Sequence, residues 1–244
     1  MAQTTALRAL PQPIYGLPRP LRPGPTQFSS GGFGANAWIK PVPQILQTVS
    51  YYPAAASPTF SPTVSQPAAG SILIMGFSAD TNSGGGYLHT VTQTNVNWRP
   101  LAMRRAAATS GVGAVFWIGH QTGTAGTSIT TSYGGQWPGC CIWEVDSTCE
   151  GVVVRTVANS SGGATSLTLT EDSETYDSLL LFIIAGQNSG GAGPTSASGG
   201  SGWTNTFNGD FGASWARAVR GSANTHTITS SRSTSWAGLL MAIR

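Results

Sequence analysis

The sequence predicts an all-β protein: a jelly-roll-like antiparallel β-sandwich built from two similar halves, preceded by an extended, proline-rich N-terminal arm. Three observations lead to this prediction. They are a continuous apolar run at 178–186, a second run of the same make-up at 71–79, and the dense prolines of residues 1–67. Such a run is too short to span a membrane, and its closure by glycine and asparagine is typical of a strand buried on both faces.

Each apolar run opens a repeat that continues downstream. Equivalent positions keep their residue type, but the number of positions that separates them decreases along the chain. This offset is 107 between Ser71 and Ser178, 105 between Trp98 and Trp203, and 99 between Trp137 and Trp236. Loop insertions produce such a drift when the order of elements is kept. The period is too long for a solenoid. We therefore expect one sandwich domain at 68–244, made of half-repeats at about 70–146 and 177–244.

The strands of this domain are expected between turn-forming segments rich in glycine, serine and threonine. In the first half they are expected near 71–79, 87–93, 98–108, 112–120, 127–132 and 139–146. In the second half they are expected near 178–186, 203–207, 213–220, 224–230 and 235–243. Two more β segments, at 152–154 and 166–170, lie between the halves.

Residues 1–67 differ in composition from the rest. They hold 12 of the 15 prolines, and no acidic residue precedes Asp80. This proline density excludes helix interiors and central strands and is typical of extended chain. A disordered tail is the simpler alternative, but large apolar side chains favour a docking arm that binds neighbouring subunits. The expected partner-binding anchors are Ile14, Tyr15, Leu17, Phe28, Phe33, Trp38, Ile39, Tyr51 and Tyr52.

Composition narrows the function. Charged residues are only 9% of the chain and the net charge is +3, with no basic cluster longer than Arg104-Arg105. We therefore expect no nucleic-acid partner and no membrane insertion. So few charges give a free monomer little protection against association. The composition therefore favours a protein that is part of a large assembly and that forms homo-oligomers. Prolines interrupt residues 1–20, so a secretory signal peptide is not expected.

Metal, cofactor and thiol sites are not indicated. The three histidines, His89, His120 and His226, lie in different expected strands without a ligand spacing. We expect neither a metal nor a cofactor. The three cysteines make no Cys-x-x-Cys pair. Cys140 and Cys141 are adjacent on a strand and point to opposite faces, so at least one is expected to be buried.

Catalysis is not expected either. Glu144 and Asp146 are two positions apart on one strand, the best carboxylate pair for a glycosidase, but a strand end that turns into a loop explains them more simply. A Gly-x-Ser-x-Gly motif in a strand–turn–helix setting does not occur. Tryptophans can stack on sugars, yet those at equivalent positions in the two halves fit a core role better.

Several of these features occur together in a known group of proteins. Gly202-Trp203-Thr204, an alanine-rich strand, a threonine-alternating strand and the closing segment from Trp236 to Ile243 resemble β-sandwich domains in virion proteins of tailed bacteriophages, often described as minor tail proteins. The resemblance covers about 70–244 and leaves out the arm. It implies a structural role and no catalytic residues.

We therefore expect a non-enzymatic structural protein of a tailed-phage virion, a minor tail or capsid-decoration protein, assembled in the host cytoplasm. Its partners would be other capsid or tail subunits, to which the N-terminal arm fastens it. The alternative is a carbohydrate-binding module for host-surface glycans, which would show an exposed aromatic side chain beside polar groups. A glycoside hydrolase would need a second carboxylate facing Glu144 across a cleft.

Overall fold

The computed structural model describes residues 42–52, 59–80, 90–105, 113–132, 136–149, 151–170, 178–186, 194–198, 204–209, 212–219 and 225–244. The chain divides into two compact units, residues 1–39 and 40–244. All the described residues belong to the second unit. This part is all-β and antiparallel, with no helix among the described residues, which confirms the predicted structural class.

The first half of the chain forms an eight-stranded sheet with the order β1-β8-β3-β6-β5-β4-β7-β2. Its strands are β1 (Ile45–Tyr51), β2 (Thr59–Phe60), β3 (Ile72–Asp80), β4 (Thr90–Gln93), β5 (Val96–Arg105), β6 (Gly113–Gln121), β7 (Ile129–Ser132) and β8 (Gln136–Val145). All pairings between them are antiparallel, as the hairpin-like connections of the sequence predict.

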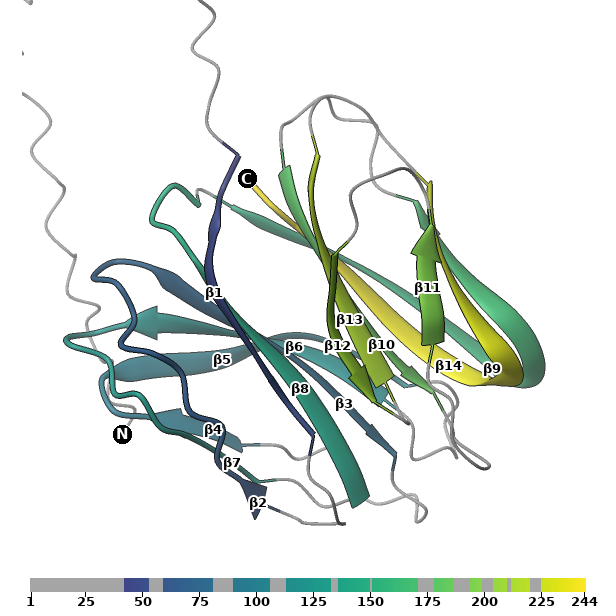
Figure 1. The fold of residues 1–244 in the computed structure, drawn as a ribbon, viewed down its shortest axis with the longest axis horizontal. Coiled ribbons are helices and arrows are strands. Elements are labelled where there is room, and N and C mark those ends of the chain that lie inside the picture. The colour runs from purple at the N-terminus through teal and green to yellow at the C-terminus, as the bar shows by residue number, and fades with distance from the viewer. Residues whose placement is uncertain are drawn as a thin grey trace, which may run out of the picture. The chain divides into compact units, whose positions relative to one another are not determined.

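The second half forms a sheet with the order β11-β14-β10-β13-β12, in which β9 also pairs with β14. Its strands are β9 (Val152–Thr170), β10 (Ser178–Gly186), β11 (Pro194–Ser198), β12 (Thr204–Gly209), β13 (Gly212–Val219) and β14 (Thr225–Ile243). Figure 1 shows the long strands β9 and β14 bending together. The segments expected at 224–230 and 235–243 are therefore one strand, irregular in register between Thr229 and Trp236.

The central strand β3 of the first sheet is apolar along most of its length because both of its faces are covered. On β3, Leu73, Met75 and Phe77 belong to one buried cluster, and Ile74 belongs to another. The first cluster also contains Phe60 of β2, Val91 of β4 and Ile129 of β7, so the sheet curls over and packs on itself. This double burial explains why β3 lacks the alternation of a half-exposed strand.

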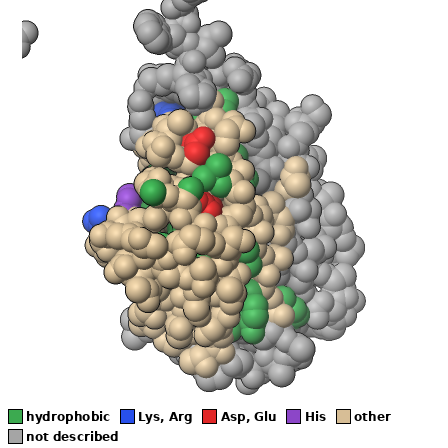
Figure 2. Space-filling view, turned by 60° about the vertical axis from the view of Figure 1, so that its left-hand side comes forward, with side chains coloured by type: hydrophobic (Ala, Val, Ile, Leu, Met, Phe, Trp, Pro, Cys, Tyr) green, Lys and Arg blue, Asp and Glu red, His purple; other side chains and the backbone are tan. Residues whose placement is uncertain are grey.

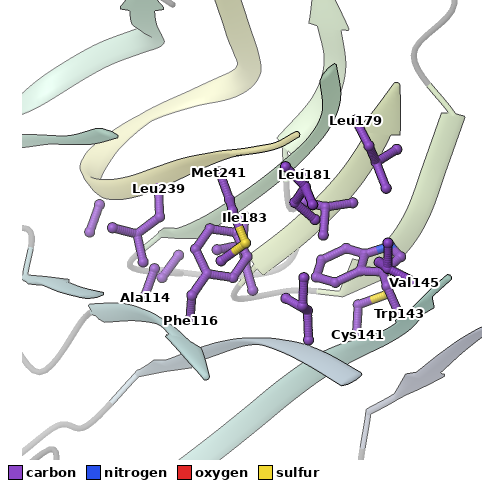
Figure 3. Close-up of a cluster of buried hydrophobic side chains, with 14 of the residues drawn as sticks. Ala114, Phe116, Cys141, Trp143, Val145, Leu179, Leu181, Ile183, Leu239 and Met241 are labelled. Carbon is purple, nitrogen blue, oxygen red and sulfur yellow. The ribbon is translucent and has the colours of Figure 1, made fainter. Parts of the chain in front are cut away.

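The second cluster joins the two sheets. It contains Ile74 of β3, Phe116 of β6 and Trp143 of β8 from the first sheet, with Leu181 and Ile183 of β10 from the second. Figure 3 shows Phe116, Trp143, Leu181 and Ile183 meeting between the sheets. The remaining buried members are Val42, Ala114, Cys141, Val145, Leu179, Ala185, Ala237, Leu239, Met241 and Ile243. Residues 178–186 are thus central to the core, as their composition predicts.

The two halves repeat one strand order. In the first half, neighbouring strands across the sheet follow the order β1-β8-β3-β6-β5. In the second half, the same spatial order is formed by the N-terminal part of β9, the C-terminal part of β14, β10, β13 and β12. The rest of the order, β4-β7-β2, corresponds to β11, the N-terminal part of β14 and the C-terminal part of β9. The repeat therefore contains eight strand positions.

Strand register accounts for the sequence offsets. Ile72 of β3 pairs with Val145 of β8, and Leu179 of β10 pairs with Ile243 of β14. The first residues of these two pairs, Ile72 and Leu179, are 107 positions apart, and the second residues, Val145 and Ile243, are 98 positions apart. The comparison can be continued from β3 through β6 to β5 in the first half, and from β10 through β13 to β12 in the second. Arg99 of β5 then corresponds to Thr204 of β12, and these two residues are 105 positions apart. The value of 105 equals the Trp98–Trp203 offset found in the sequence.

The offset of 99 between Trp137 and Trp236 reflects a β-bulge. Ser78 pairs with Gly139 and Asp80 pairs with Gln136, so β8 has one extra residue at this point. The pairing of β10 with β14 runs through Trp236 without such a shift. One inserted residue changes the offset from 98 to 99, so the repeat found in the sequence is a repeat of backbone pairing.

The body of the protein begins upstream of residue 68. Strand β1 pairs along its length with β8, and β2 pairs with β7. After β2 the chain continues along β7, with backbone hydrogen bonds from Val64 N to Thr127 O (2.8 Å) and from Ile129 N to Pro62 O (3.0 Å). Residues 42–52 and 59–67 thus belong to the sheet, and the docking arm remains a prediction for residues 1–41, which lie outside the described residues.

Candidate functional site

Glu144 is the buried acid of the described residues. It lies on β8, directly beside the edge strand β1, and is only 2% exposed. Its Oε1 accepts hydrogen bonds from the backbone N of Ala68 (2.6 Å) and from Ser71 Oγ (2.6 Å), and its Oε2 accepts one from Gln47 Nε2. Buried carboxylates need such partners. The carboxylate therefore ties β1 and the segment before β3 to β8.

Two glutamine amides complete this network. Gln47 on β1 accepts a hydrogen bond from Ser65 N at 2.9 Å. Gln121, at the end of β6, donates through Nε2 to the carbonyl oxygens of Ala68 (2.7 Å) and Ser71 (3.0 Å) and to Ser71 Oγ (2.9 Å). Residues 65–71 are thus held from three strands at once. We call this set, Gln47, Ser71, Gln121 and Glu144 with the segment 65–71, the Glu144 lock.

The candidate carboxylate pair, Glu144 and Asp146, is not assembled on β8. The strand ends at Val145, and Asp146 lies in the turn that follows. There its Oδ1 accepts hydrogen bonds from Thr148 N (3.2 Å) and Thr148 Oγ1 (2.6 Å), a local side-chain turn. Both acids therefore have hydrogen-bonding roles within their own chain, which favours the simpler of the two explanations for the pair.

A shallow hollow of about 390 Å³ lies beside the Glu144 lock. Its volume is within the usual range for small-molecule sites. The lining is uncharged and consists of Gln66, Pro67, Ala69, Gly70, Gln121, Gly123 and Thr124. Gly70 has a φ of 79°, the left-handed conformation that favours glycine, and it directs the chain around the hollow. The chemistry offered is that of amides, hydroxyls and backbone groups, which suits a neutral polar ligand.

The structure places two of the expected anchors against the core of their own chain. The ring of Tyr51 stacks on Phe60 with centroids 5.1 Å apart, and Phe60 stacks on Phe77 at 5.9 Å. Tyr52 packs against the cluster between the sheets. The other expected anchors, Ile14, Tyr15, Leu17, Phe28, Phe33, Trp38 and Ile39, lie outside the described residues.

The most exposed large apolar side chains of the described residues are Leu101 and Met103 on β5, with Leu46 on β1. On β5 they lie between two exposed arginines, Arg99 and Arg104. A strand that shows apolar and basic side chains together offers both buried area and charge to another protein. Among the described residues, β5 thus exposes large apolar and basic side chains on one strand.

Two of the described thiols, those of Cys140 and Cys149, have a raised pKa. Burial, together with the neighbouring Cys141, raises the pKa of Cys140 above its usual value. Burial also raises the pKa of Cys149. A raised thiol pKa lowers the fraction of reactive thiolate. Within the described ranges, histidines, cysteines and acids form no cluster of three or more that could hold a metal ion.

Sequence reasoning missed the Glu144 lock and the hollow. The lock joins residues up to 97 positions apart, such as Gln47 and Glu144, and glutamine and serine follow no spacing rule that marks such contacts. The one available signal was Glu144 itself, a lone acid within an apolar strand. A buried acid needs partners, but the sequence does not say which.

The comparisons with known proteins identify no relative. Tested against protein-family models, curated proteins and solved structures, the chain matches none of them. In the part of the chain that the structure describes, no helix has the length and apolar character needed to cross a membrane.

Proposed function

We propose that this protein is a non-enzymatic structural component of a tailed-phage virion, a minor tail or capsid-decoration protein, fastened to neighbouring subunits by its N-terminal segment. The observation that carries the proposal is the strand order of each half. Four neighbouring strands, β1-β8-β3-β6, continue into four others, β5-β4-β7-β2, that curl back over them. We interpret this order as a jelly roll that occurs twice in the chain, a fold common in viral capsid and lectin domains.

The surface supports an assembled protein. Charged residues are 9% of the chain, about a third of the usual share. Figure 2 shows one face, on which uncharged polar side chains and backbone cover most of the described part and charged side chains are few. A surface of this kind repels other proteins weakly. It therefore suits permanent contact with neighbours, including copies of the same chain.

The hydrogen bonds of Glu144 support a structural role over a hydrolytic one. A general acid must reach the glycosidic oxygen of a substrate. The two oxygens of Glu144 accept hydrogen bonds from Ala68, Ser71 and Gln47 and lie in a side chain that is 2% exposed. Access of a sugar to this carboxylate would require opening the Glu144 lock.

The proposal is tested with a variant that lacks residues 1–41. It keeps every strand of the described body, so it should fold with the urea midpoint of the full chain while no longer joining the particle. Incorporation is measured by quantitative mass spectrometry of purified virions after complementation. A matched pair of full-length variants refines the test: Ile14, Tyr15 and Leu17 replaced by serine, against Gln3, Thr4 and Thr5 replaced by serine. Normal incorporation of the shortened protein would contradict the proposal.

A carbohydrate-binding role is the second candidate, and the hollow beside the Glu144 lock favours it. Its amide and hydroxyl groups suit sugar hydroxyls, although the hollow's lining includes no aromatic side chain. The Thr124→Trp substitution would fill the hollow from an exposed position. If the hollow binds a glycan, this change should abolish signals on a glycan array that the wild type gives, while Thr92→Trp, on exposed β4, should leave them unchanged.

A further inference from the structure

The two halves meet through the same face. With the offsets set by strand register, Ile74 corresponds to Leu181, Cys141 to Leu239, Trp143 to Met241 and Val145 to Ile243. All of these residues belong to the single buried cluster between the sheets. A face that packs against its own equivalent is the property of an isologous interface, the kind found in twofold-symmetric dimers.

The contacts between strands of the two halves are reciprocal. Where β6 contacts β10, the equivalent β13 contacts β3, and where β6 contacts β14, β13 contacts β8. Likewise β5 contacts β14 and β9, while the equivalent β12 contacts β8 and β1. Strand β3 contacts β10, which is its own equivalent. A twofold relation between the halves requires this complete set of exchanged contacts.

In a twofold interface, a residue meets its own equivalent only at the axis. Gly76 and Ile183 are such a pair, because they are 107 positions apart and occupy the same place in the register. A Cβ atom on Gly76 would lie 2.9 Å from Ile183 Cδ1 and 2.9 Å from Trp143 Cζ3. The axis position thus holds the smallest residue from one half and a large one from the other.

The difference in size between Gly76 and Ile183 determines which half packs well against which. Two copies of the first half would face each other with Gly76 against Gly76, which leaves a void where the Ile183 side chain lies. Two copies of the second half would bring two isoleucines into the space that one fills. Voids and overpacking both destabilise an interface. Gly76 and Ile183 together avoid both.

We propose that this chain is a covalently joined pseudo-dimer of one eight-stranded unit, whose pseudo-twofold axis passes between Gly76 and Ile183. The unequal axis pair makes each half the preferred partner of the other half rather than of a copy of itself. This inference does not depend on a virion role.

A double-mutant cycle on the full-length chain tests the axis. Gly76→Ala and Ile183→Ala should each lower the urea midpoint, the first by a steric clash and the second by a cavity. Because Ile183→Ala removes one of the two side chains that the new Cβ would meet and leaves Trp143 as the other, the double variant should lose less than the sum of the two losses. Residues that do not face each other would give additive losses.

Gly119 provides the matched control. A Cβ atom there would meet Val96 Cγ1 at 2.8 Å and Trp98 Cε2 at 2.9 Å, both in its own half. Gly119→Ala should therefore destabilise as Gly76→Ala does, but its loss should add to that of Ile183→Ala. If the pair Gly76→Ala and Ile183→Ala is as additive as this control pair, the proposed axis is wrong.

Partner preference is tested by cutting the folded chain between its halves. A protease site inserted between the exposed residues Ser147 and Thr148 lies in the turn between β8 and β9. After cutting, both fragments should elute together at the size of the intact chain. After unfolding in urea and refolding, native mass spectrometry should find mainly mixed pairs. Fragments that separate on cutting, or self-pairs as abundant as mixed pairs, would overturn the proposal.

Discussion

At the scale of single residues, Glu144 shows how one carboxylate can determine the path of a loop. Hydrogen bonds to a charged group are stronger than those between neutral groups. Ala68 N and Ser71 Oγ, both at 2.6 Å, belong to the segment that borders the hollow. The acid therefore sets the shape of the hollow although it does not line it.

Replacing Glu144 by glutamine should destabilise the protein. One carboxylate oxygen becomes an NH2 group that faces N–H or O–H donors, so at least one buried hydrogen bond is lost. We expect a loss of about 1–3 kcal/mol in the free energy of unfolding, measured by urea denaturation. Asp146→Asn is the control, because the asparagine oxygen can still accept from Thr148 in the exposed turn. Equal losses in both variants would show that the Glu144 lock contributes nothing.

At the scale of elements, β1 decides where the domain starts. It supplies Gln47 to the Glu144 lock and Ile45 and Tyr51 to the two buried clusters, and Tyr52, which follows it directly, also packs against one of them. The second half repeats the arrangement in the N-terminal part of β9. The backbone hydrogen bond from Asp146 N to Gln44 O (3.0 Å) has its counterpart from Arg244 N to Gly151 O (2.9 Å). The repeat unit therefore includes the strand before residue 68.

Two truncations measure this contribution. A variant that begins at residue 42 should show the urea midpoint of the full chain. A variant that begins at residue 68 loses β1 and β2, which exposes the edge of β8 and leaves Glu144 without Gln47. It should show no cooperative unfolding transition by circular dichroism. A cooperative transition in the shorter variant would mean that residues 68–244 are sufficient for the fold.

At the scale of the whole molecule, the shared cluster couples the two halves. Ile74 and Leu181 are equivalent residues on opposite sides of the cluster, and both are fully buried. Since each half covers an apolar face of the other, neither can unfold without exposing that face. The described body should therefore behave as a single cooperative unit.

Calorimetry tests this coupling. Ile74→Ala and Leu181→Ala should each cost about 2–5 kcal/mol, and both should shift the same single unfolding peak to lower temperature. Val91→Ala, in the curl of the first half, serves as a control for a change within one half. Two peaks, one shifted by each variant, would show that the halves unfold independently.

The sequence predicted those elements whose signals are local. The apolar runs that became β3 and β10, the threonine-rich segment of β7 and the closing strand β8 were expected within a few residues of their observed bounds, whereas the short segments expected at 166–170, 224–230 and 235–243 are parts of the longer strands β9 and β14. Strand β1 was missed because Pro43 precedes it and Pro53 follows it, and the prolines of the whole segment suggested extended arm. Seven residues between two prolines can still form an edge strand, where few backbone donors are needed.

Strand content, the repetition and the low charge can be read from the sequence alone, because residue type and period follow directly from burial and turn formation. The three-dimensional structure was needed to show that each half curls over its own sheet, that β1 belongs to the body, and that Glu144 is held by residues far along the chain. It was also needed to show that equivalent faces meet. These features depend on pairings between residues that are distant in the chain, and local propensity does not specify which distant residue pairs with a given one.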